Sequence, residues 1–191
     1  MPRNFGLSRH EGLPAAFDLS RSGYFLDFAL VPFAELALIA TALWRGLHPA
    51  GLVAALLTGA VVWSFAEYWI HRLVFHGPTA FEPMHQMHHA LPKDLIGVAS
   101  LGTFGGFAGI WLIAYILVGG SLCSAATAGF MSGYLFYCAI HVGMHHFEAR
   151  GFGRYGAMMR RLHAAHHRGG KGNFGVSSPV WDIVFRTYRK A

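Results

Sequence analysis

The sequence contains few charged residues and almost no cysteine. Only 13% of its 191 residues are charged, and two are cysteine. Soluble domains carry about 25% charged residues, so this composition argues against a soluble fold. Cys123 and Cys138 lie in apolar stretches without a redox or metal-binding spacing, which indicates packing and excludes a disulfide framework. Residues 1–24 also lack the apolar core and cleavage site of a signal peptide, so we interpret them as a cytoplasmic tail.

Hydrophobic residues are abundant instead. They form 54% of the chain, and the mean hydropathy is +0.39. A helix needs roughly 20 apolar residues to cross a bilayer. Four stretches qualify, at residues 25–44, 52–70, 98–118 and 122–141. The turns after the first and third are short, so we expect an all-α integral membrane protein with two helical hairpins. We treat residues 1–191 as one domain, in which residues 142–191 form a cytoplasmic cap and tail.

Glycine pairs occur in the third and fourth of these stretches. Gly102 and Gly106 are four residues apart, as are Gly105 and Gly109, and the fourth stretch contains Gly129 and Gly133. This spacing predicts close approach of helices in lipid. The alternative is the ordinary glycine frequency of membrane helices.

Histidine is unusually frequent and is grouped. Ten of the 13 histidines form four groups: His71 and His76; His85, His88 and His89; His141 and His145; and His163, His166 and His167. Each group falls at the expected cytoplasmic end of a span, or in the loop or tail beside it. We therefore expect all four groups to meet at one site.

The spacing within the groups indicates metal binding. Residues three and four apart share one face of a helix, as His85 and His89 or His141 and His145 would. Neutral imidazole is a common metal ligand, and ten imidazoles exceed the coordination sphere of one ion, so we expect two metal ions. The alternative is a set of surface histidines at a membrane interface, which explains one group more easily than four. His10 and His48 have no histidine neighbours, and His146 is as well explained by packing or support as by ligation.

At this point the pattern resembles a known family. The order H-x4-H, H-x2-HH, H-x3-H and H-x2-HH is similar to that of the fatty acid hydroxylase/sterol desaturase superfamily of membrane dimetal enzymes. The tail "NFGVSSPVWDIVFRTY" resembles the family's stretch after its last histidine group. The resemblance covers residues 67–188 and implies that the ten histidines named above are the metal ligands. It also implies O2-dependent hydroxylation or desaturation of a lipid, with two metal ions, expected to be iron, and electrons from a separate ferredoxin or cytochrome b5 type of protein.

Two carboxylates are candidates for supporting this site. Glu67 lies one helical turn before His71, and we expect it to orient that imidazole. Asp182 is suggested by the resemblance of the tail. Glu35 is an ionisable residue inside the first span and is either functional or a protonated helix contact. Asp94 and Glu148 are equally well explained as loop and solvated residues.

The substrate expected first is a fatty acyl lipid, because a basic cytoplasmic face would attract an anionic head group while the chain lies between helices. Alternatives within the superfamily are a carotenoid ring hydroxylase and a sterol or lipid desaturase. An alternative of another class is a membrane metal-binding or transport protein, although transport sites usually lie near the bilayer midplane. We expect no nucleic-acid partner. The "LHPAG" stretch is similar to a haem-binding motif of cytochrome b5, but it lies in an outer turn between two spans, so we expect the electron donor to be separate.

The basic residues predict the orientation in the membrane. Of the 15 lysines and arginines, only Arg45 falls in the short turns, and the other 14 lie on the opposite side. Positive charge marks the cytoplasmic side, so both termini should be cytoplasmic. Reporter fusions at each end of the chain test this prediction. An external C-terminus would contradict it and would separate the last histidine group from the others.

Overall fold

A computed structural model describes residues 13–147 and 150–191, and in these ranges the chain is helical. His10 and Glu148 lie outside the described residues, as do the tail residues 1–12. The helices are α1 (Arg21–Phe25), α2 (Asp27–Trp44), α3 (Pro49–Trp69), α4 (Glu82–Ala90), α5 (Ser100–Val118), α6 (Gly120–His146), α7 (Gly153–Gly169) and α8 (Val180–Val184). Three short segments complete them: η1 (Ala15–Phe17), η2 (Ile70–Phe75), which is a π-helix, and η3 (Arg150–Phe152).

Four helical segments are long and apolar enough to cross a membrane, which confirms the expected fold class. They are Arg21–Trp44, Pro49–Phe75, Ser100–Val118 and Gly120–His146. The second and fourth are longer than the apolar stretches predict, because their histidine-bearing ends continue as helix. The turn expected between the third and fourth stretches, at residues 119–121, is also shorter than predicted. Gly119 alone separates α5 from α6, and Gly119 and Gly120 have φ values of 61° and 59°, which glycine adopts without steric strain.

Helix α6 lies in the middle of the bundle and contacts α2, α3 and α5. Over half of its apolar window (56%) is buried, whereas the value is 17% or less in the other three spans. Small residues such as Ala125 and Ala128 are fully buried on α6. They let the neighbouring helices approach, which is how helices pack in lipid without a hydrophobic driving force.

Glycines bring α3 and α6 into contact through their backbones. A Cβ atom added to Gly129 would lie 2.0 Å from the carbonyl oxygen of Leu56, and one added to Gly59 would lie 2.0 Å from that of Ala126. The side chain of Trp63 approaches Gly133 in the same way, at 2.7 Å. The prediction of close approach is therefore confirmed for Gly129 and Gly133 of α6.

The same prediction is wrong for α5. Added Cβ atoms on Gly105, Gly106 and Gly109 would meet nothing within 4 Å, and one on Gly102 would approach only Val98, four residues earlier. The physical reason is the position of α5 at the edge of the bundle, where Phe107 is its one buried residue. Glycine spacing alone does not distinguish a central helix from an edge helix.

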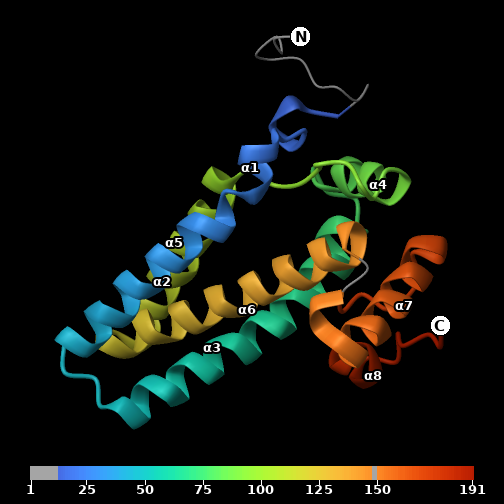
Figure 1. Cartoon of the computed structure of the whole chain (residues 1–191). Helices are drawn as coiled ribbons and strands as arrows, with labels where there is room; N and C mark the ends of the chain where they lie inside the picture. Colours follow the sequence, from blue (N-terminus) through green and yellow to red (C-terminus); the bar gives the residue numbers. More distant parts are fainter. Residues whose placement is uncertain (1–12, 148–149) are drawn as a thin grey trace.

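Helices α4, α7 and α8 gather at one end of the bundle, opposite the turn between α2 and α3 (Figure 1). The π-helical end of α3 and the last turns of α6 reach the same end. This arrangement brings the four histidine-bearing segments together.

The glycine contact predicts a stability difference between two Gly→Ala variants. Gly129→Ala should destabilise the protein by about 2 kcal/mol, because the new methyl group meets backbone that cannot move aside. Gly105→Ala, the matched control, should be neutral or stabilising by up to about 1 kcal/mol, since alanine favours helix. Thermal unfolding in detergent, followed by circular dichroism, measures both. Equal midpoints for the two variants would contradict the packing described here.

Candidate metal centre

The histidine side chains form two groups at this end of the bundle. Within each group, the nitrogen atoms able to bind a metal lie within 4.8 Å of one another. The first group is His71, His76, His85, His89 and His166, and the second is His88, His141, His145 and His163. His167 lies beside both, with its Nε2 3.0 Å from Nε2 of His163 and its ring stacked on His89 at 4.2 Å. The structure thus brings all ten sequence-predicted ligands together.

The π-helix explains how His71 and His76 reach the same group. Five residues along an α-helix turn the chain by about 500°, which places two side chains roughly 140° apart. In η2 the amide of His76 donates to the carbonyl of His71, five residues earlier, at 3.2 Å. This wider turn returns the second imidazole to the face of the first. Sequence reasoning missed this element, although the unusual H-x4-H spacing is its signal.

Helix α4 contributes to both groups. His85 and His89 are four residues apart and face the first group, whereas His88 contacts the rings of His141 and His145 in the second, at 4.9 and 4.8 Å. Helix α7 also contributes to both groups, because His166 belongs to the first group and His163 to the second. Because two helices serve both groups, the groups cannot move apart independently.

Two backbone carbonyls fix imidazole orientation in the first group. Nδ1 of His71 lies 2.5 Å from the carbonyl oxygen of Phe174, and Nδ1 of His166 lies 2.8 Å from that of Gly172. A carbonyl only accepts hydrogen bonds, so each Nδ1 carries the proton and each Nε2 presents a lone pair to the group. Sequence reasoning missed both carbonyls, since backbone groups leave no residue-type signal.

The distances between imidazoles fit a shared ion. Nε2 of His166 lies 3.0 Å from Nε2 of His76, and Nε2 of His71 lies 3.0 Å from Nε2 of His85. Two nitrogen ligands at right angles, each about 2.1 Å from an ion, are about 3.0 Å apart. Neither group includes a carboxylate among the described residues, so imidazole nitrogen is the donor type that the chain offers.

Burial keeps these imidazoles neutral. Removal from water lowers the pKa of His76 to about 4, with a further contribution from His89. Burial likewise lowers the pKa of His166 and of His167 to about 3. A neutral imidazole is the form that binds metal, so the groups are ready to do so at neutral pH.

The loop that holds His71 and His166 is itself held by two buried carboxylates. Asp182 accepts hydrogen bonds from the amides of Phe174 and Gly175 at 2.8 and 2.7 Å, and from the hydroxyl of Thr187 at 2.7 Å. Asp182 is 1% exposed. It therefore fixes the backbone that carries the Phe174 carbonyl.

Glu67 does not hydrogen-bond to His71, and its expected role in orienting that imidazole stays a prediction. Oε1 of Glu67 accepts from the amides of Val176 and Ser177, at 2.7 and 2.8 Å, and Oε2 accepts from the Ser177 hydroxyl. Both oxygens are thus taken by the loop, whose backbone offers donors in better positions than the imidazole one turn away. Glu67 acts on His71 through the loop and the Phe174 carbonyl.

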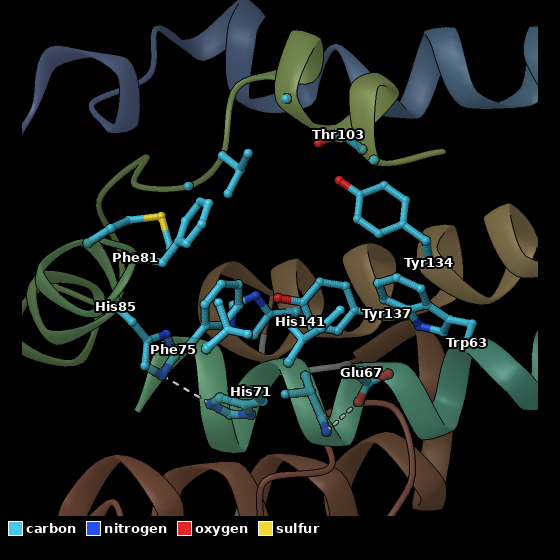
Figure 2. Close-up of a pocket in the computed structure, with 18 of the residues that line it drawn as sticks. Trp63, Glu67, His71, Phe75, Phe81, His85, Thr103, Tyr134, Tyr137 and His141 are labelled. Atoms are coloured by element: carbon cyan, nitrogen blue, oxygen red, sulfur yellow. Dashed lines mark hydrogen bonds between the residues drawn. The ribbon is translucent and has the colours of Figure 1, made fainter. Parts of the chain in front are cut away.

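A largely apolar cavity of about 380 Å³ opens onto both histidine groups. It lies between α3, α5 and α6, and His71, His85, His88 and His141 form part of its wall. Figure 2 shows His71, His85 and His141 with the aromatic rings of Phe75 and Tyr137 near them, and Thr103 and Tyr134 farther along the wall. A cavity of this size and lining suits an apolar ligand.

The remaining candidates lie outside both groups. The ring of His146 packs at 6.2 Å from that of Tyr24. His48 caps α3, since its Nδ1 accepts from the amide of Ala50 at 3.3 Å. Glu35 is half-buried on α2, and Asp94 lies in the loop between α4 and α5. None of these residues joins the histidine groups.

The sequence of this chain is similar to those of known hydroxylases. The family model described as fatty acid hydroxylase matches residues 56–187. The chain is 32% identical to dihydroceramide fatty acyl 2-hydroxylase FAH1 of Arabidopsis thaliana, over 71% of this chain and 61% of that protein. It is 30% identical to human fatty acid 2-hydroxylase, over 69% of this chain and 38% of that protein. The chain thus spans about three fifths of the length of the plant relative and less of the human one.

A solved structure shares the fold. It is described as full-length scs7p with only the hydroxylase domain visible, and it matches with a TM-score of 0.77 at 24% identity, over 88% of this chain and 67% of that one. The family match runs from the middle of α3 to the residues after α8 and includes all four histidine groups. This chain therefore belongs to the fatty acid hydroxylase family.

Proposed function

We propose that this protein is a membrane-bound oxygenase that hydroxylates a lipid, with a fatty acyl chain as the substrate. The ten histidines would hold two metal ions, and iron is the ion proposed. The observation that carries this proposal is the apolar cavity of about 380 Å³ whose wall includes histidines of both groups. The names of the relatives, which are fatty acyl and fatty acid hydroxylases, support the choice of substrate.

The reaction proposed is R–H + O2 + 2e⁻ + 2H⁺ → R–OH + H2O. Bound iron ions would supply the redox chemistry that side chains lack. The chain's own residues bind and position the substrate. Aromatic residues such as Phe75 and Phe107 line the cavity and exclude water. The histidines in the cavity wall would place a carbon of the acyl chain beside the proposed metal ions.

The loop after α7 keeps the first histidine group in position. The carbonyls of Phe174 and Gly172 hold the protons of two imidazoles at Nδ1, and Glu67 and Asp182 hold the loop. This support from outside the ligands is what maintains ligand geometry in metal sites. Glu67 and Asp182 are therefore positioning residues in this proposal.

Electrons would come from a separate protein of the ferredoxin or cytochrome b5 type. Helix α7 directs His163 and His166 inward, while Arg154, Arg160, Arg161 and Arg168 are exposed on it. Such a basic surface favours approach of an acidic donor to the ligand-bearing helix. The proposed orientation, with this end of the bundle in the cytoplasm, would give a soluble donor access to it. A metal carrier is less well supported, because the histidines lie at the helix ends and not along a path through the bundle.

The ten histidines predict two metal ions per chain. Because the loop after α7 supports only the first group, weakening this loop should release the ion of the first group. Asp182→Asn weakens the hold on the Phe174 carbonyl, so metal affinity of the first group should fall roughly 10- to 100-fold while the second group stays occupied. Elemental analysis of protein purified without chelators should give two ions for the native chain and a value near one for the variant. Ser178→Ala is the control, because Ser178 is in the same loop but half-buried, and its hydroxyl accepts from the amide of Val180. Native metal content below one per chain after addition of iron would contradict the dimetal proposal.

Substitution of the last histidine group should abolish oxygenation. His166→Ala or His167→Ala should reduce incorporation of ¹⁸O from ¹⁸O2 into cellular lipid to background, because each removes a nitrogen from the clustered set. His146→Ala is the matched control and should retain incorporation, since this imidazole packs on Tyr24 outside both groups. Mass spectrometry of lipids from expressing cells measures all three. If the native protein with a competent reductant incorporates no label and the variants alter cellular metal content, the carrier alternative replaces the enzyme.

A further inference from the structure

Helix α8 has one buried side and one exposed apolar side. Asp182 is 1% exposed and holds the loop after α7. By contrast, Val180, Ile183 and Val184 are 52%, 61% and 57% exposed. Their spacing of three and four residues places these three side chains on one face of the helix. This apolar face is largely uncovered by the part of the chain that the structure describes.

The side chain of Trp181 fixes α8 against the membrane helix α3. Its indole Nε1 donates to Oγ of Ser64 at 3.0 Å, and its ring lies 4.9 Å from the ring of Phe65. Phe65 is 41% exposed, and Val61, one helical turn earlier on the same face, is 60% exposed. Both residues belong to an apolar span, so their exposed side chains face lipid. The apolar face of α8 therefore adjoins the lipid-facing surface of α3.

The chain after α8 is basic. Arg186, Arg189 and Lys190 are exposed, and residues 183–191 contain no acidic residue. Anionic lipid head groups attract basic side chains at the membrane surface. Apolar residues that enter the bilayer, beside basic residues that stay among the head groups, are typical of an interfacial helix. A soluble partner protein could cover α8 only by also meeting the lipid-facing side chains of α3, so lipid is the partner that fits this face.

We propose that α8 lies in the membrane surface with Val180, Ile183 and Val184 in lipid, and that this contact holds Asp182 in position on the metal-site loop. The part of the chain that we expected to be a cytoplasmic tail would then include a membrane contact. The second half of the proposal rests on the proposed function, because it concerns metal binding by the first histidine group.

The coupling to the histidines follows from the position of Asp182 within α8. Its carboxylate accepts from the amides of Phe174 and Gly175, and the carbonyl of Phe174 orients His71. Because Asp182 lies between Trp181 and the lipid-facing residues, movement of α8 away from the membrane would move this carboxylate. The bilayer thus contributes to the geometry of the first histidine group through one short helix.

Nitroxide labels on the full chain, in nanodiscs of phosphatidylcholine and phosphatidylserine, test the position of α8. The labels are attached through Ile183→Cys, through Lys190→Cys and, as a lipid reference, through Ile116→Cys, since Ile116 is 73% exposed on α5. The two native cysteines are replaced by alanine. O2 concentrates in lipid, whereas a water-soluble nickel chelate stays outside it. The label at position 183 should relax mainly with O2, as at position 116, and the label at position 190 mainly with the chelate.

Release of metal to a chelator tests the coupling. The double variant Ile183→Glu and Val184→Glu should release the ion of the first group roughly 10-fold faster in nanodiscs, while the second group keeps its ion. Both native side chains are exposed, so the new charges disturb little packing inside the protein and act by leaving the lipid. Ile183→Leu with Val184→Leu is the matched control and should retain both ions.

The outcomes separate this proposal from the function on which it rests. A label at position 183 that relaxes mainly with the chelate would overturn the proposal, and so would one shielded from both reagents, which would indicate a covering protein. Unchanged metal release in the double glutamate variant would also overturn it. A lipid-type response with faster release, but without ¹⁸O incorporation by the native protein, would support the proposal and reject the oxygenase. If the native protein held no metal, the dimetal proposal and the coupling would both be rejected, and the label at position 183 would still decide the membrane contact.

Discussion

The hydrogen bonds from the loop after α7 to Glu67 are the interaction on which the histidine site depends. They join a segment near the end of the chain to the last turn of α3, with both oxygens of a 4% exposed carboxylate occupied. The carbonyls of the same loop set the tautomer of His71 and His166. Because a buried carboxylate and buried amides are each unfavourable alone, the loop and the helix hold one another in place. The orientation of the first histidine group follows from that contact.

The histidine site also depends on the central position of α6 in the bundle. Close contact between α3 and α6 at Gly59 and Gly129 leaves little space between these helices in the half of the bundle away from the histidines. Toward the histidine end, α5 and the aromatic residues of α6 enclose the large cavity instead. Tight packing at one end and an open volume at the other place the free space of the bundle beside the imidazoles.

The sequence predicted the spans and the meeting of the histidine groups, because both depend on properties that residue type reveals. Apolar length determines which segments can cross a bilayer, and the order of the spans places the four groups at the same end of the bundle. The hydrogen-bond partners of Glu67 were not predicted, because neighbours along a helix are visible in sequence, whereas a loop from 109 residues later is not. The α5 glycines were misassigned because periodicity does not show which helix is central.

The π-helix at residues 70–75 also has a consequence for reading related sequences. In an unbroken α-helix, two histidines that share a face are separated by two or three residues. A gap of four residues places them on one face only where the backbone hydrogen bonds have shifted to the wider register. Removing one residue between His71 and His76 would restore the α-helical register and still leave both imidazoles on one face. A four-residue gap between two histidines that share a face therefore predicts a π-helix from the sequence. A hydropathy profile does not contain this information.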